Sequence, residues 1–323
     1  MKYLKKHKKL IISLIVSLLV IISGGVYIGY QYGPNFNFYL VPPTPKRDAM
    51  LAFNKISSTG IYTANQARKN RLTEIRNDIS IKNTYKEIYP LLKQALEIKG
   101  GKHSSLITPA EVREEASQYK APTSRVKNDI LYVHLPEFSG SSSQGKRYAN
   151  TLYHKLTSKT YKGIIIDLRN NLGGDIGPML AGVSPVVPNG KLFEIVNSAN
   201  KSTSVTFQGS VTNNMGTKID LGKVKKITGI PVAVILNRWT ASSGELTALA
   251  LENNPNVKTF GGNSAGYTSI NDTYTMYNGA QVNITAEKVK KNNGRILFNN
   301  KIKPDVQTNK PIVRANKWLL TQN

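Results

Sequence analysis

The segment 240–245 (TASSGE) places two serines where an apolar run at 231–237 (PVAVILN) gives way to a helical pattern at 242–253. A serine hydroxyl at such a junction lies near the free backbone amides of a helix N-terminus, which favour developing negative charge. The oxyanion formed in acyl transfer needs such donors. The competing interpretation is structural, because Ser242 with Glu245 also matches an S-x-x-E capping box.

A second motif lies at 162–174 (KGIIIDLRNNLGG), where a buried strand at 163–168 ends in a polar turn and a glycine pair. Taken alone, this pair indicates an ordinary tight turn. Two further segments follow in order, GGNSAGYT at 261–268 and a glycine-arginine then proline-aspartate pattern at 294–306. With these four motifs, residues 128–310 resemble the tail-specific, or carboxyl-terminal processing, protease family of S41 serine peptidases.

The resemblance implies roles for particular residues. It makes Ser242 the nucleophile, with the adjacent Ser243 as the alternative. It also implies an oxyanion hole of backbone amides, from Ser243 and from Gly174 or Gly173. Glycine suits that task because its backbone approaches a ligand closely and adopts positive φ without a steric penalty.

The sequence departs from the family at Tyr267, where most members carry a general-base lysine 25 positions after the serine. A tyrosine with a pKa near 10 is a poor proton acceptor at neutral pH, and histidine is the natural substitute. Of the four histidines, His7 precedes an apolar span, His134 lies in an apolar strand and His154 on a helix. His103 occurs in a glycine-flanked loop at 99–105 (KGGKHSS), where functional groups are common.

The GGKHS segment, the TASSGE motif and AGYTS in place of the lysine motif resemble a narrower branch of the family, the nisin resistance proteins. That branch implies a dyad of Ser242 as nucleophile and His103 as base and then acid. It also implies cleavage of a lantibiotic near its C-terminal tail. No spacing identifies a third member, and four carboxylates remain possible orienters of His103: Glu111, Glu114, Glu115 and Glu245.

The N-terminus predicts a membrane anchor. Residues 10–30 form an uncharged stretch long enough to cross a bilayer, and five lysines precede it. The positive-inside rule then keeps the N-terminus in the cytoplasm and places the chain after about residue 31 outside a bacterial cell. A cleaved signal peptide is the competing interpretation, although the run is longer than a usual signal h-region. The chain has no cysteine, so neither a lipoprotein anchor nor a disulfide framework is expected.

The net charge of +25 comes from 44 Lys and Arg against 19 Asp and Glu. An anionic membrane surface or cell-wall polymer explains this excess better than nucleic acid does, because the lysines are scattered and have few aromatic neighbours. A cationic lantibiotic would need a local acidic patch, for which Asp272 and Glu245 are candidates. A lantibiotic transporter is a possible neighbouring partner. We see no metal or cofactor motif, and we expect these substrate contacts: Tyr267, Asn271, Asp272, Met179 and Leu180.

The chain divides into an anchor at 1–30, a linker and helical bundle at 31–127, and a protease core at 128–323. The proline-rich linker spans 41–45, and apolar spacing predicts helices at 46–56, 63–79, 83–98 and 107–118. A strand at 130–138, a helix at 146–158 and the strand at 163–168 predict a right-handed β-α-β unit. We therefore expect an α/β core of mixed sheet with flanking helices, like the ClpP/crotonase units, plus a small β cap at 186–228 and no PDZ module.

Three functions of different classes follow. The first is a membrane-anchored serine peptidase that gives resistance to a lantibiotic. The second is a general processing protease with the same chemistry, acting on unmodified peptides. The third is a non-catalytic protein that binds peptide or a cell-wall precursor in a protease-like groove, an alternative that the missing lysine keeps open. The distance between His103 and Ser242 separates the third from the others.

Overall fold

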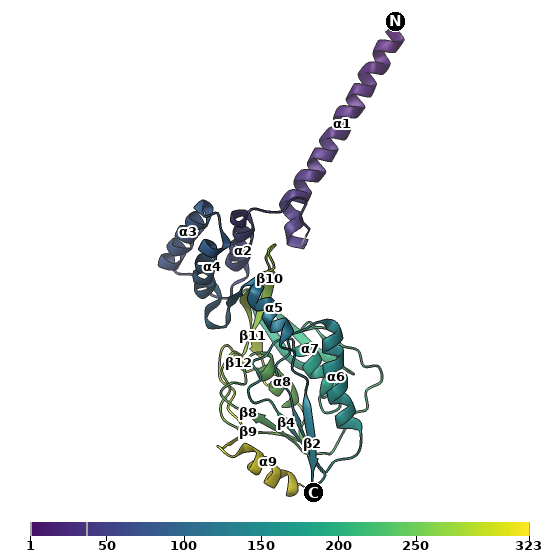
Figure 1. Ribbon diagram of the computed structural model, residues 1–323, viewed down its shortest axis with the longest axis vertical. Helices are drawn as coiled ribbons and strands as arrows, with labels where there is room; N and C mark the ends of the chain where they lie inside the picture. The colour runs from purple at the N-terminus through teal and green to yellow at the C-terminus, as the bar shows by residue number, and fades with distance from the viewer. Residues whose placement is uncertain (1, 37, 323) are drawn as a thin grey trace.

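The computed structural model describes residues 2–36 and 38–322 (Figure 1). The helices are α1 (Lys2–Tyr32), η1 (Gly33–Phe36), α2 (Pro45–Thr59), α3 (Gln66–Ile81), α4 (Tyr85–Gly100), η2 (Gly101–His103), α5 (Pro109–Ser117), α6 (Ser142–Thr157), α7 (Ile176–Gly182), α8 (Ser243–Leu251) and α9 (Pro311–Leu320). The strands are β1 (Ser105–Ile107), β2 (Thr123–Lys127), β3 (Ile130–His134), β4 (Gly163–Asp167), β5 (Gly190–Asn197), β6 (Ser202–Gln208), β7 (Val211–Asn213), β8 (Val232–Leu236), β9 (Val257–Gly261), β10 (Ser269–Thr275), β11 (Gln281–Lys290), β12 (Ile296–Leu297) and β13 (Val306–Gln307).

Helix α1 extends away from the rest of the molecule (Figure 1). Its segment Leu10–Tyr32 has a mean hydropathy of 2.6 and none of it is buried. Among the described residues, this is the one helix long and apolar enough to span a bilayer. Such an uncovered apolar helix is compatible with a single-pass anchor.

The expected α/β core is a six-stranded sheet in the order β13-β9-β8-β4-β3-β2. All its pairings are parallel except β2 with β3. Alternate residues of the central strands face opposite sides: Ile164 and Val234 enter the main core, whereas Ile165 and Ile235 pack with α9. Because both faces are covered, the central strands are continuous apolar runs.

A second, seven-stranded sheet contains β5, β6 and β7 from the expected cap segment. These strands are antiparallel and continue through β11 to β1, β10 and β12. The side chains of Phe193 and Phe207 are buried in the same cluster as the first sheet. The cap segment is therefore continuous with a sheet that also includes residues before and after it in the chain.

The bundle of α2, α3 and α4 packs on the β10–β11 hairpin rather than standing alone (Figure 1). Ile56, Ile88 and Leu92 of the helices share one cluster with Val282 and Ile284 of β11. Strand β1, which follows α4, pairs with β11. Residues on both sides of the predicted division near residue 128 therefore share one hydrophobic cluster.

A buried carboxylate fastens this bundle to the hairpin. Asp48 of α2 is fully buried and accepts hydrogen bonds from the Tyr277 amide, at 3.1 and 3.0 Å, and from the Tyr85 hydroxyl at 2.8 Å. Burial raises the pKa of Asp48, against these hydrogen bonds, which lower it. Removing the carboxylate would leave the Tyr277 amide without its acceptor.

Helix starts follow capping residues more closely than apolar periodicity does. Thr108 and Glu111 form a capping box at α5, as the expected helix there requires. Helix α6 begins four residues before the expected start at 146, because Ser141 and Gln144 form a capping box. The early turn of α6 carries few apolar residues, so periodicity alone placed its start too late.

We predict that Asp48→Ala lowers the free energy of unfolding by about 1–3 kcal/mol, the cost of leaving a buried donor unsatisfied. Urea unfolding of the detergent-solubilised chain, followed by circular dichroism, measures this. Glu74→Ala is the control, because the Arg71–Glu74 pair is exposed and should contribute less than about 1 kcal/mol. Equal effects of the two substitutions would contradict the role given to Asp48.

Candidate active site

Ser242 lies at the turn between β8 and α8, with φ 50° and ψ −121°. A non-glycine residue with positive φ is uncommon, and the surrounding structure must hold it there. The Ala241 amide donates to the Asn171 carbonyl at 2.9 Å, and the Thr240 hydroxyl donates to the Leu168 carbonyl at 2.8 Å. The loop after β4 therefore fixes the loop that carries Ser242.

His103 reaches Ser242 from the end of the helical bundle. Gly101, with φ 70°, ends α4 and turns the chain into the short helix η2. The Nε2 atom of His103 lies 3.1 Å from the Ser242 Oγ, across 139 positions of sequence. The side-chain amide of Asn271 donates to the His103 backbone carbonyl at 2.8 Å, which anchors the histidine backbone to β10.

The other nitrogen of His103 contacts a residue that we did not predict. Its Nδ1 lies 2.7 Å from the Ser269 Oγ, and the Ser269 hydroxyl donates to Asn299 Oδ1 at 2.9 Å. Because the Ser269 hydroxyl donates its proton to Asn299, its oxygen accepts a hydrogen bond from the protonated Nδ1 of His103. The unprotonated Nε2 can then accept a hydrogen bond from the Ser242 hydroxyl. Ser269 is the last residue of the AGYTS segment, so this motif could have indicated its role in the sequence.

The four carboxylates considered as orienters of His103 have other roles or positions. Glu111 caps α5 through Thr108, and Glu114 accepts from Gln118. Glu115 lines the groove at the active site without a hydrogen bond to His103. Sequence spacing gave no reason to prefer a serine, because orienters of a catalytic histidine are usually carboxylates.

Glu245 is fully buried beneath the active site. Its carboxylate accepts from the Ser242 amide at 3.0 Å, the Gly266 amide at 2.9 Å and the Tyr267 amide at 2.7 Å, and also bonds to the Ser264 hydroxyl. The bond from the Ser242 amide is the part of the expected capping box that the Glu245 side chain supplies. Glu245 ties the Ser242 turn to the 264–267 segment, so it is not part of an acidic patch facing a substrate.

Tyr267 occupies the position of the family's lysine, and its ring packs beside the His103 ring. The two ring centroids are 5.1 Å apart, and the Lys102 ammonium lies 4.9 Å from the Tyr267 ring centroid. Burial, with a smaller contribution from the nearby Lys102 charge, lowers the pKa of His103 from 6.5 to about 4. His103 is therefore neutral at pH 7, as a general base must be.

The glycine pair lies directly against the serine turn. A side chain on Gly173, whose φ is 112°, would meet the Ser242 Cβ at 2.8 Å and the Ser243 amide nitrogen at 3.1 Å. The Gly173 amide donates to Asn171 Oδ1 at 2.9 Å, so it is not free for an oxyanion. Within the described structure, the amides of Ser243 and Gly174 donate to no protein acceptor. The Ser243 hydroxyl donates to the Gly174 carbonyl at 2.6 Å, away from His103.

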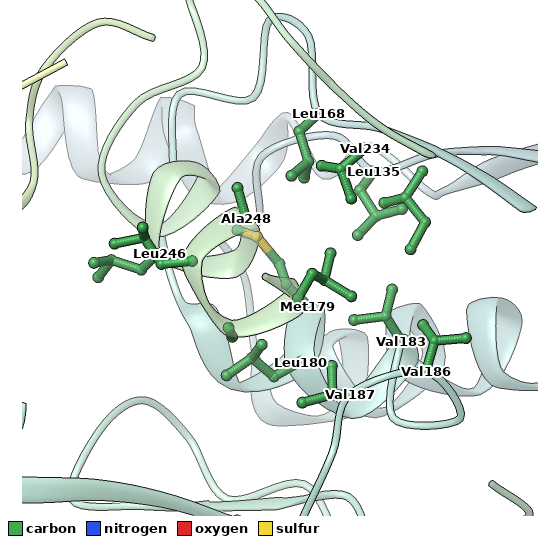
Figure 2. Packing of buried hydrophobic residues seen from close by; sticks show 14 of the residues in the cluster. Leu135, Leu168, Met179, Leu180, Val183, Val186, Val187, Val234, Leu246 and Ala248 are labelled. Atoms are coloured by element: carbon green, nitrogen blue, oxygen red, sulfur yellow. The ribbon is translucent and has the colours of Figure 1, made fainter. Parts of the chain in front are cut away.

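A groove of about 920 Å³ contains Ser242, His103 and the glycine pair. Asn271 lines it, as expected for a substrate contact, whereas Tyr267 and Asp272 do not. Asp272 forms an ion pair with Lys55 at 2.8 Å. The prediction that Met179 and Leu180 contact substrate is wrong, because both are fully buried in the core beneath α8 (Figure 2).

The groove is acidic in an otherwise basic protein. Among the described residues that line it there is no lysine or arginine, and four carboxylates are present: Glu115, Glu137, Asp175 and Glu287. Glu137 pairs with Lys120, and Asp175 caps α7. Glu115 and Glu287 form no salt bridge within the described structure. Burial raises the pKa of Glu287, and the negative Asp272 contributes in the same direction.

Residues 129–308 match the sequence profile of Peptidase family S41. The chain is 36% identical to the nisin-resistance protein of Lactococcus lactis subsp. lactis, over 99% of each chain. It is similar to the structure of a lipoprotein from Streptococcus agalactiae, with a TM-score of 0.82, 30% identity, and 88% and 99% of the two chains covered.

A photosystem II D1 C-terminal processing protease shares the fold, with a TM-score of 0.56 and 14% identity, over 82% of this chain and 93% of that one. The family profile covers more than half of the sequence, and the lactococcal relative covers nearly all of it. The protein is therefore a serine peptidase that belongs to peptidase family S41.

Proposed function

We propose that the protein is a membrane-anchored peptidase that cleaves the C-terminal tail of a cationic lantibiotic such as nisin, with Ser242 and His103 as its catalytic dyad. The observation that carries the proposal is the 3.1 Å approach of His103 Nε2 to Ser242 Oγ. This distance lies within hydrogen-bonding reach of a nucleophile and its base. It also argues against the alternative of a non-catalytic binder.

In the proposed reaction, His103 Nε2 accepts the Ser242 proton while Oγ bonds to the scissile carbonyl carbon. The amides of Ser243 and Gly174 donate to the resulting oxyanion. The C–N bond then breaks, and His103 gives its proton to the leaving amine. Water, deprotonated by the same histidine, hydrolyses the acyl-enzyme and regenerates Ser242. Ser269 and Asn299 are positioning residues, since Ser269 contacts His103 and Asn299 in turn contacts Ser269.

The substrate class rests on similarity and on charge. The lactococcal relative bears the name nisin-resistance protein and matches over nearly the full length of this chain. The groove has carboxylates on separate elements and, among its described lining residues, no opposing cation. Glu115 on α5 and Glu287 on β11 are placed to attract basic side chains into a groove that the net charge of +25 would otherwise disfavour.

The cellular arrangement follows from the N-terminal helix. We infer that α1 anchors the protein in a bacterial membrane, with the lysine-rich end in the cytoplasm and the catalytic region outside. The scattered positive charge would hold that region near anionic lipid. In this position the enzyme meets a membrane-active peptide where that peptide acts, and a lantibiotic transporter is a possible neighbour.

We predict that the wild-type protein shortens nisin and that Ser242→Ala abolishes this turnover while nisin still binds. His103→Ala should lower kcat by roughly 10²- to 10⁴-fold, the usual contribution of a general base. Mass spectrometry of nisin and of an unmodified linear peptide after incubation measures both. Cleavage of the linear peptide alone would replace our proposal with general processing, and cleavage of neither would favour the binder.

Ser269→Ala should lower kcat by roughly 10²-fold with little change in KM, because His103 loses the acceptor that holds its tautomer. Ser269→Thr retains the hydroxyl and should restore most of the activity. Asn299→Asp keeps an acceptor for Ser269 and should also remain active, unlike Asn299→Leu. A Ser269→Ala enzyme with the wild-type kcat and pH profile would show that this contact does not position His103.

The acid limb of the kcat/KM profile should have its midpoint near pH 4 rather than 6.5, since the pKa of His103 is lowered to about 4. Folding stability should fall as the pH drops from 6.5 to about 4, because in this range the unfolded chain binds a proton that the folded His103 resists. Lys102→Gln removes a positive neighbour and should shift the limb upward. A limb near 6.5 that this substitution leaves unmoved would rule out the buried histidine as the base.

A further inference from the structure

A second pocket, of about 600 Å³, lies at the carboxyl ends of four parallel strands of the six-stranded sheet. Ligands of open α/β sheets commonly bind at this edge. The described lining residues come from the loops after β4, β8 and β9, from the end of β13 and from one loop residue before it: Asn170, Asn237, Arg238, Trp239, Gly262, Asn263, Lys301 and Gln307. No residue of this pocket lines the active-site groove.

The pocket and the groove share the same two loops. After β4, Asn170 lines the pocket and Leu172 lines the groove; after β8, Trp239 lines the pocket and Ser242 lines the groove. Different residues of the same two loops therefore line the two hollows. Occupation of the pocket would contact the loop that leads to Ser242 without entering the groove.

The pocket has the opposite charge to the groove. Arg238 and Lys301 are exposed, and neither forms a salt bridge or side-chain hydrogen bond in the part of the chain that the structure describes. No carboxylate lies among the described lining residues. The pocket therefore offers two uncompensated cations, one of them a guanidinium suited to bidentate binding of a carboxylate or phosphate.

An aromatic surface accompanies these charges. The Trp239 side chain is 52% exposed, although large apolar side chains of this kind are usually covered. The Arg238 guanidinium carbon lies 5.3 Å from the Trp239 ring centroid, so the charged group and the ring are adjacent. An exposed indole face packs well against the C–H face of a sugar ring, because both are flat and weakly apolar.

Amide side chains complete the pocket and are already held in place. Asn237 Nδ2 donates to Asn170 Oδ1 at 2.8 Å, and Gln307 Nε2 donates to Asn263 Oδ1 at 2.8 Å. Among the described contacts, the side-chain nitrogens of Asn170 and Asn263 (Nδ2) and the side-chain oxygen of Gln307 (Oε1) have no partner. They provide donors and an acceptor of the kind that sugar hydroxyls require.

We propose that this pocket binds an acidic saccharide, a sugar that carries a carboxylate or a phosphate. Arg238 and Lys301 bind the acidic group, Trp239 stacks on the ring, and the amides bind hydroxyls. A cationic peptide and an anionic glycan would thus bind in two separate hollows that share two loops. Binding of an anionic polymer outside the cell would hold the catalytic region close to the membrane surface. The inference does not depend on which peptide the groove cleaves.

The test uses tryptophan fluorescence of the full chain in detergent micelles, since Trp239 and Trp318 are the two tryptophans. The probes are trigalacturonate, which carries carboxylates, and glucose 1-phosphate, with maltotriose and inorganic phosphate as controls. We expect an acidic sugar to change the emission in wild type and in Trp318→Phe. In Trp239→Phe that change should be absent, and dialysis with the labelled sugar should show weaker binding.

Arg238→Gln should weaken binding by about tenfold or more, the loss of one charge-assisted contact. Lys303→Gln is the matched control, because Lys303 is exposed two residues from Lys301 but does not line the pocket. Response to trigalacturonate alone identifies a carboxylate ligand, and response to glucose 1-phosphate alone identifies a phosphate ligand. Binding of maltotriose or inorganic phosphate as tight as that of the acidic sugars overturns the proposal, as does the absence of any binding.

Discussion

The approach of His103 to Ser242 is the interaction on which the rest of the structure depends. The two residues lie 139 positions apart in the chain, and their side chains meet at 3.1 Å only because the helical bundle is fastened to the β10–β11 hairpin. Asp48 holds one end of that junction, and the pairing of β1 with β11 holds the other. A bundle that packed independently would leave His103 without a fixed position.

Burial has a second consequence at this junction, because it sets the protonation of the site. A histidine enclosed beside Tyr267 and Lys102 resists a positive charge, so its pKa is lowered to about 4 and it stays neutral where a base is needed. The acidic groove outside it has the opposite polarity to the protein's net charge. In the proposed function, different groups would therefore attract a cationic peptide and keep the base neutral.

Much of the fold and part of the site were predictable from sequence. The apolar runs at 163–168 and 231–237 are long, β-branched and followed by motifs, so the central strands and the loops they carry were clear. Ser269 was not, because strand β10 has no apolar pattern and the contact of Ser269 with His103 joins residues 166 positions apart in the chain. Met179 and Leu180 were misassigned because nearness to the glycine turn in sequence says nothing about which way a short helix faces (Figure 2).

The central claim is that His103 activates Ser242, and the most direct measurement is the rate and site of labelling by a fluorophosphonate. This reagent forms a bond between phosphorus and an activated serine Oγ and releases fluoride. Our account predicts one adduct, located on Ser242 by tandem mass spectrometry, with labelling at least about 10²-fold slower in His103→Ala. Labelling at Ser243, or an unchanged rate in His103→Ala, would contradict it.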